Sequence, residues 1–125
     1  MNTLTEFGKC MKLQLLNHNL HTVDVAEMMG YSPAYLSAIF HGKRKPTIKF
    51  LNKYLRSLTK LLTEDEVSNI INTYYSSEHK LVIDLDDVSN AKRELAYKLV
   101  LLFNEVETDE DAKLWLERIN SYVKH

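Results

Sequence analysis

Apolar residues recur every three or four positions along most of the chain, and this spacing predicts α-helices. In the first half, helices are expected at about residues 5–17, 23–29 and 33–41, and a fourth begins near residue 47. The residues that mark these limits are Thr22 and Ser32 as N-caps, Pro33 in a first turn, and Gly30 and Gly42 beyond helix ends. The apolar faces contain Leu4, Phe7, Met11 and Leu15 in the first helix, and Ile48, Leu51, Leu55 and Leu58 in the fourth, with Phe50 and Tyr54 beside them.

The second half of the chain has the same periodicity. The sequence TEDE at residues 63–66 is a capping box and predicts a helix to about residue 75. Residues 80–85 predict either a short strand or an extended connector. A long helix is expected at about residues 88–105, and a last helix follows a cap at Thr108. With only three glycines and two prolines in 125 residues, the pattern predicts an all-α fold.

Composition narrows the class of protein. A hydrophobic content of 45% with 26% charged residues is typical of a globular protein. The longest apolar run falls well short of the roughly 20 residues of a transmembrane helix, and the N-terminus lacks the apolar core of a signal peptide. The single Cys10, expected in the core, excludes an internal disulfide. These features predict a cytoplasmic protein that does not enter a membrane.

The net charge of −1 conceals two halves of opposite charge. Residues 1–62 contain nine Lys or Arg and three Asp or Glu, a net charge of +6, whereas residues 63–125 contain seven bases and fourteen acids, a net charge of −7. Because electrostatic fields are screened within about 10 Å, a basic half can attract phosphate even in a neutral chain. We therefore expect two domains, residues 1–62 and residues 63–125.

Residues 22–41 match the pattern of a helix-turn-helix. Ala26 is small where two helices would cross, and Gly30 lies in the turn, where a positive φ is needed. The positions expected to lock the two helices together are all apolar: Val25, Met29, Leu36 and Ile39. Agreement of six positions at once predicts this motif strongly.

The stretch VAEMMGYSPAYLSAIFHGKRKPT resembles the lambda-repressor-like DNA-binding domains, the Cro/XRE type of helix-turn-helix. The resemblance covers about residues 3–62, and residues 63–125 resemble no family that we recognise. It implies that the helix at residues 33–41 enters the major groove of double-stranded DNA, and that dimers bind two half-sites a helical turn apart.

The resemblance also implies which residues touch DNA. Base-edge contacts fall at Ser32, Pro33, Ala34, Ser37 and Ala38, with Tyr35 and His41 beside them; Thr22 holds a phosphate, and Lys43, Arg44 and Lys45 contact the adjacent backbone. Family members often have Gln, Arg or Asn where this chain has Pro33, Ala34 and Ala38, and those longer side chains discriminate bases by hydrogen bonding. Specificity is therefore expected from DNA shape, dimer spacing or a second surface, and a domain that no longer binds DNA is the alternative.

The interpretation of Tyr35 has two alternatives. Its ring can lie along a sugar or a thymine methyl group while its hydroxyl reaches a phosphate. Alternatively, Tyr35 packs against the preceding helix and only stabilises the fold. The sequence leaves both open.

Other chemistry has little support. Asp84, Asp86 and Asp87 near His79 suggest a metal or acid–base site, but we expect these carboxylates to cap the long helix that follows. The chain lacks phosphate-binding glycine loops and the usual hydrolase, metalloprotease and redox motifs. We predict no enzyme activity, no metal and no cofactor.

The apolar helices of the second half have two possible roles. They either cover the back of the first domain within one chain or pair with a second copy, and we predict a homodimer through residues 63–125. The sequence as a whole predicts a DNA-binding transcriptional regulator, a repressor of prokaryotic or phage type. The alternative is a helix-turn-helix module that binds another protein, such as an antitoxin or a phage inhibitor of a host defence system.

Overall fold

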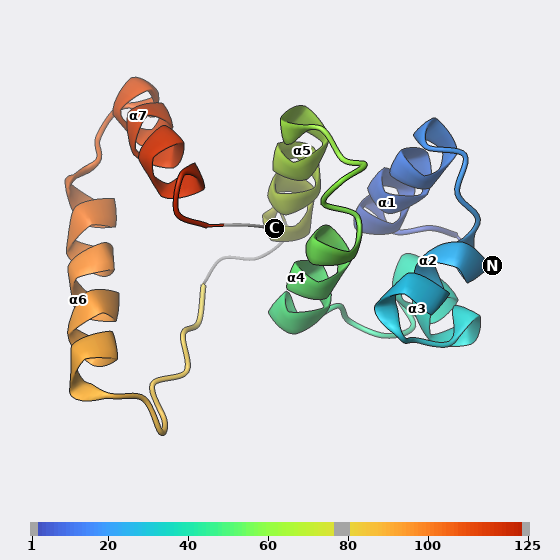
Figure 1. Cartoon of the computed structure of the whole chain (residues 1–125), viewed down its shortest axis with the longest axis horizontal. Coiled ribbons are helices and arrows are strands. Elements are labelled where there is room, and N and C mark those ends of the chain that lie inside the picture. Colours follow the sequence, from blue (N-terminus) through green and yellow to red (C-terminus); the bar gives the residue numbers. More distant parts are fainter. Residues whose placement is uncertain (1–2, 77–80, 124–125) are drawn as a thin grey trace. The chain divides into compact units, whose positions relative to one another are not determined.

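A computed structural model describes residues 3–76 and 81–123, and every element in these ranges is an α-helix (Figure 1). The helices are α1 (Glu6–Asn17), α2 (Thr22–Met29), α3 (Pro33–Phe40), α4 (Ile48–Ser57), α5 (Glu64–Tyr75), α6 (Asn90–Glu105) and α7 (Asp109–Asn120). The all-α prediction is confirmed. Of the segment predicted as strand or connector, residues 81–85 are a connector, and residue 80 lies outside the described ranges.

The described part of the chain divides into two compact units, residues 3–76 and residues 81–123. The predicted boundary near residue 62 falls inside the first unit, because α5 packs against α1 and buries Ile70 completely. The charge of the chain changes sign at residue 62, but the packing continues across it. Charge therefore located the end of the basic region and not the end of the folded unit.

The core of the first unit is built by contacts of α1 with α3 and α5 and of α2 with α3 and α4. The six positions of the predicted helix-turn-helix behave as expected: Val25, Ala26, Met29, Leu36 and Ile39 are no more than 1% exposed, and Gly30 has a φ of 75°. The backbone N–H of Tyr31 donates to Ala26 O at 2.8 Å and closes the end of α2. These residues fix the angle between α2 and α3.

Several predicted details need correction. Thr22 is the first residue of α2, and its N-cap is His21, whose backbone N–H donates to the carboxylate of Asp24 at 2.9 Å. Ile48 is 52% exposed, because it lies in the first turn of α4 at the edge of the buried face. The cap of α6 is the Ser89 hydroxyl, which accepts from Lys92 N at 3.2 Å.

The prediction that the aspartates before α6 cap this helix is therefore wrong. The carboxylate of Asp84 instead accepts a hydrogen bond at 2.9 Å from the backbone N–H of Asp86, within the turn. His79 lies outside the described residues. Among those residues, no group of three His, Cys, Asp or Glu side chains is placed to hold a metal ion.

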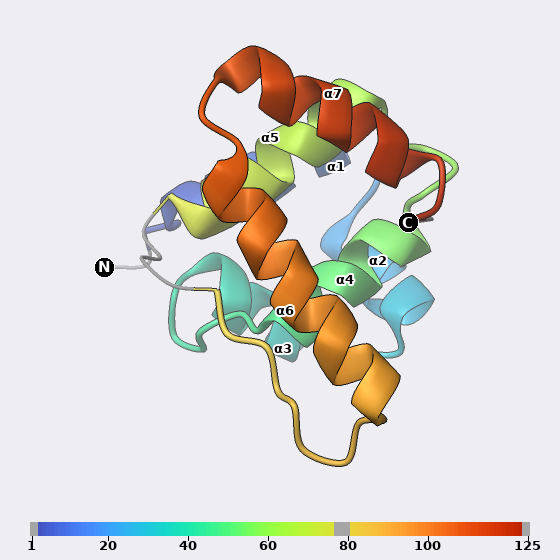
Figure 2. The ribbon, with the colours of Figure 1, turned by 90° about the vertical axis from the view of Figure 1, so that its left-hand side faces the viewer.

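The second unit consists of α6 and α7, joined by a short connection at residues 106–108 (Figure 2). None of its described residues is buried. Large apolar side chains are exposed along both helices and just after α7, among them Leu95, Leu99, Val100, Leu101, Phe103, Leu114 and Leu116 on the helices and Tyr122 and Val123 beyond α7. The broad apolar surface predicted for the long helix is thus present without a core of its own.

Candidate nucleic-acid interface

Helix α3 presents one face to the core and the opposite face to solvent. The Ser32 side chain accepts from Tyr35 N at 3.1 Å, and Pro33 follows in the first turn, so the start of the helix is firmly defined. Its inward residues Leu36, Ile39 and Phe40 are at most 1% exposed. Pro33 and Ala34 are exposed, while Ser37 and Ala38 are partly exposed. The five predicted base-contacting positions therefore lie outside the core at one end or on one side of α3.

The C-terminal end of this face carries a polar pair. His41 Nδ1 lies 2.9 Å from the backbone oxygen of Ser37 and 3.4 Å from the Ser37 hydroxyl. Because a carbonyl oxygen only accepts, Nδ1 carries the hydrogen, and Nε2 of a neutral ring is left as an acceptor. The structure thus joins two predicted contact residues through one turn of helix.

Tyr35 packs within the first unit, but not against the helix that the structural alternative named, and its contact with DNA stays a prediction. Its partly buried ring lies 4.8 Å from that of Tyr31 and 6.4 Å from that of Phe50, measured between centroids. It therefore packs on the turn after α2 and on α4 rather than on α2 itself. The Tyr35 ring also contacts a cation, since Arg44 Cζ lies 5.5 Å from the ring centroid.

The basic loop is attached to the end of α3. The backbone N–H groups of Lys43 and Arg44 both donate to Ala38 O, at 2.8 and 3.2 Å, after Gly42 turns the chain with a φ of 74°. The side chains of residues 43–45 are exposed. The loop therefore continues the exposed side of α3 as a positively charged border. Thr22 is partly buried at the start of α2.

A family model described as helix-turn-helix matches residues 11–64. Residues 11–64 belong to the lambda-repressor-like helix-turn-helix family. This family consists of DNA-binding regulators, so DNA binding is the general function of the domain. No curated protein and no solved structure matches the chain significantly.

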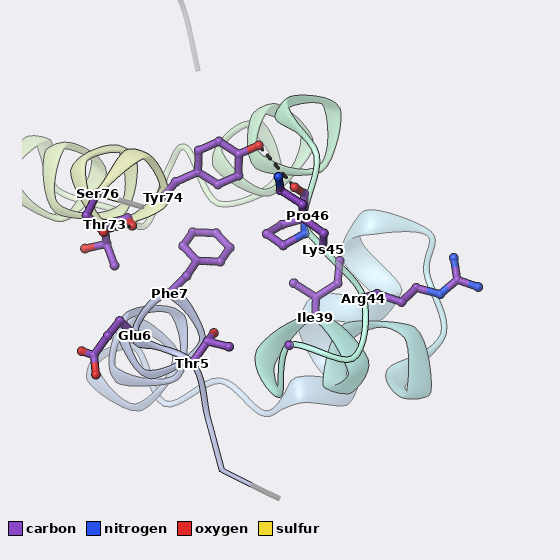
Figure 3. Close-up of a pocket in the computed structure, with 11 residues that line it drawn as sticks. Thr5, Glu6, Phe7, Ile39, Arg44, Lys45, Pro46, Thr73, Tyr74 and Ser76 are labelled. Carbon is purple, nitrogen blue, oxygen red and sulfur yellow. Dashed lines mark hydrogen bonds between the residues drawn. The ribbon is translucent and has the colours of Figure 1, made fainter. Parts of the chain in front are cut away.

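Helix α5 packs against the helix-turn-helix domain, and the sequence did not predict this contact. A cavity of about 400 Å³ separates the start of α1, the basic loop and the end of α5, and Figure 3 shows Phe7, Ile39, Pro46 and Tyr74 around it. The Tyr74 hydroxyl donates to Pro46 O at 3.3 Å across this space. α5 therefore contacts the segment that follows the basic loop. Only the tertiary packing brings residues 46 and 74 together.

A second link joins the start of α5 to the end of α1. His18 Nε2 lies 2.9 and 3.0 Å from the two carboxylate oxygens of Glu66. The same carboxylate accepts from Thr63 N at 2.9 Å, which completes the predicted capping box. The Thr63 N–H, with a smaller contribution from His18, holds the pKa of Glu66 below its usual 4.5.

Replacing Glu66 with glutamine is expected to lower the free energy of unfolding by about 1 kcal/mol at pH 7. Since the folded pKa of Glu66 is below its unfolded value, its charge stabilises the fold fully above about pH 4.5. That contribution is lost as the pH falls through the lower pKa of the folded state. Urea unfolding at several pH values should show the difference between parent and variant shrinking below pH 4.5. Glu64→Gln, on the exposed side of the same turn, is the control, and a pH-independent difference would contradict this role.

No helix in residues 3–76 or 81–123 is long and apolar enough to cross a membrane.

Proposed function

We propose that the protein is a sequence-specific repressor of prokaryotic or phage type, which acts in the cytoplasm on double-stranded DNA. One observation carries the proposal: α3 exposes a face of small side chains, and the basic loop at residues 43–45 is hydrogen-bonded to the end of that face. A helix with this exposure fits the major groove, and the loop then lies against the phosphates of one strand.

The side chains on α3 suit a close approach to the bases. Ala34 and Ala38 offer methyl groups that fit against thymine methyls, and Ser32 and Ser37 offer hydroxyls that donate or accept. Nε2 of His41 adds an acceptor near Ser37. Because these groups discriminate bases weakly, the domain also depends on DNA shape and on the spacing of half-sites.

The half-site spacing requires a dimer, and we propose that the second unit supplies it. No described residue of its two helices is buried, and each helix exposes large apolar side chains. A unit of about 45 residues without a core is too small to be stable alone, so it needs a partner surface. A second copy offers the same two apolar helices, and pairing the two copies buries the apolar faces of both.

The most direct test uses the DNA immediately upstream of the gene that encodes this protein, because small repressors of this type commonly regulate themselves. In a gel shift at fixed salt concentration, we expect that fragment to bind at least about 10³-fold more tightly than a shuffled fragment of equal length. Equal binding of the two would contradict autoregulation by specific DNA binding.

A second function is favoured by the lack of long polar side chains on α3. In that case the helix-turn-helix scaffold binds a protein, as an antitoxin does or a phage inhibitor of a host defence system. Failure of any DNA sequence to bind more tightly than bulk DNA would support this function.

Lys43 and Lys45 are expected to provide charge-dependent affinity without sequence preference. Changing both to glutamine should weaken binding to all sequences alike and reduce the slope of log K against log salt by about 2, roughly 0.9 for each phosphate contact. The measurement is a salt titration of binding to specific and shuffled DNA. Changing Lys92 and Lys98 of α6 to glutamine is the matched control, and an unchanged slope in the loop variant would show that the loop does not touch DNA.

A further inference from the structure

We infer that Arg44 contacts a base edge and supplies discrimination that α3 itself lacks. The inference rests on the proposed DNA binding and moves Arg44 out of the group of backbone contacts. Among the sequence positions implied in DNA contact, Arg44 alone has a planar side chain with several hydrogen-bond donors. The question is therefore whether the structure directs it toward the bases.

The backbone of Arg44 is fixed beside the exposed face of α3. Its N–H donates to Ala38 O at 3.2 Å, and Lys43 N donates to the same oxygen at 2.8 Å. Ala38 is one of the residues expected to face the bases. The backbone of Arg44 therefore lies next to the surface of α3 that is proposed to enter the groove.

The side chain of Arg44 then runs back along α3. Its Cζ lies 5.5 Å from the ring centroid of Tyr35, one turn nearer the N-terminus than Ala38. In Figure 3 its guanidinium points away from the cavity and from Phe7 and Ile39. The charge is therefore placed on the exposed side of α3, beside the residues expected to face DNA.

The Tyr35 ring is a fixed surface for this guanidinium. It contacts Tyr31 at 4.8 Å and Phe50 at 6.4 Å between centroids, and Phe50 is 1% exposed. A guanidinium lying on an aromatic ring keeps the hydrogens at its edge available, so it can still donate two parallel hydrogen bonds to O6 and N7 of guanine. Among residues 3–76 and 81–123, no carboxylate forms an ion pair with Arg44.

The test separates the charge of Arg44 from its geometry. Arg44→Lys keeps the positive charge needed at a phosphate but removes the planar pair of donors. Sites are selected from random DNA with the full-length parent, and each guanine of the preferred site is then replaced in turn. For one guanine per half-site, we expect the parent to lose about 10-fold or more in affinity and Arg44→Gln to lose almost nothing. Arg44→Lys should lose an intermediate factor, because an ammonium can still donate to guanine but not through a fixed planar pair.

Two matched variants complete the experiment. Lys43→Gln, in the same loop, should weaken every site alike and keep the full penalty at that guanine. Tyr35→Leu should remove much of the guanine preference, whereas Tyr35→Phe, which keeps the ring, should retain it; thermal unfolding identifies any variant that fails to fold. If Arg44→Gln keeps the parent's penalty at every guanine, the inference is wrong and Arg44 contacts phosphate. If the parent itself selects no site, the proposed DNA recognition fails, and the role of Arg44 fails with it.

Discussion

Replacing Gly8 with alanine is expected to destabilise the first unit strongly. Gly8 lies in α1 where this helix crosses the end of α3, and an added Cβ would overlap the carbonyl oxygen of Phe40 and lie 2.8 Å from its carbonyl carbon. Both atoms belong to backbone, and Phe40 O also accepts from Thr5 N at 3.1 Å, so neither helix can shift cheaply. We expect a loss of about 3 kcal/mol or more, a large part of the total stability of a small domain.

Urea unfolding followed by circular dichroism measures this loss, and Gly30→Ala is its control. Gly30 has a φ of 75°, but a Cβ there would have no atom within 4 Å. Its replacement should therefore cost only the backbone strain of the left-handed conformation, about 1–2 kcal/mol. Equal losses for the two variants would mean that α1 and α3 are not in close contact at Gly8.

The second large effect is expected in α6. Changing Leu99 and Phe103 to glutamate places two charges on the proposed dimer surface, where these side chains are 46% and 78% exposed in the single chain. Because nothing described in the second unit is buried, the change disrupts association rather than an internal core. The variant should sediment as a monomer and bind specific DNA about 10²-fold or more weakly, since one domain no longer holds the other near its half-site.

The control for this variant lies on the charged side of the same helix. Glu94 and Lys98 form a weak pair at 3.8 Å, and changing both to glutamine should leave dimerisation and DNA binding intact. A parent chain that sediments as a monomer, or a Leu99 and Phe103 variant that remains a dimer, would contradict the proposed surface. In either case the apolar residues of α6 must meet another partner.

The helix-turn-helix could be predicted because its signals are local. A glycine in the turn, a serine cap followed by proline, and apolar residues three and four positions apart each act over a few residues, and all agreed at residues 22–41. The structure confirmed the buried positions and the conformation of Gly30. The predicted cap of α2 was wrong by one residue. His21 is extended and Thr22 is already helical, and the polarity of the two side chains does not indicate this difference in backbone conformation.

Apart from the caps of α2 and α6, the missed features depend on contacts between distant segments. The close approach at Gly8 is made with Phe40, and the attachment of α5 depends on Ile70 and on the His18–Glu66 pair. No periodicity along the chain marks such pairs. The same limit applies to the interface, where the contacts of Tyr35 with Phe50 and Arg44 bring together three segments whose proximity follows from the fold.

Selection of binding sites from random DNA, with the parent and with Ser37→Arg, tests the central claim most directly. Ser37 is partly exposed on α3, so a longer side chain should be tolerated by the fold and should reach the bases. The account predicts that the parent enriches a defined site with two related halves, and that Ser37→Arg enriches a different site with an added guanine preference. Identical sites selected with equal strength by both proteins, or no enrichment by the parent, would contradict recognition of DNA by α3.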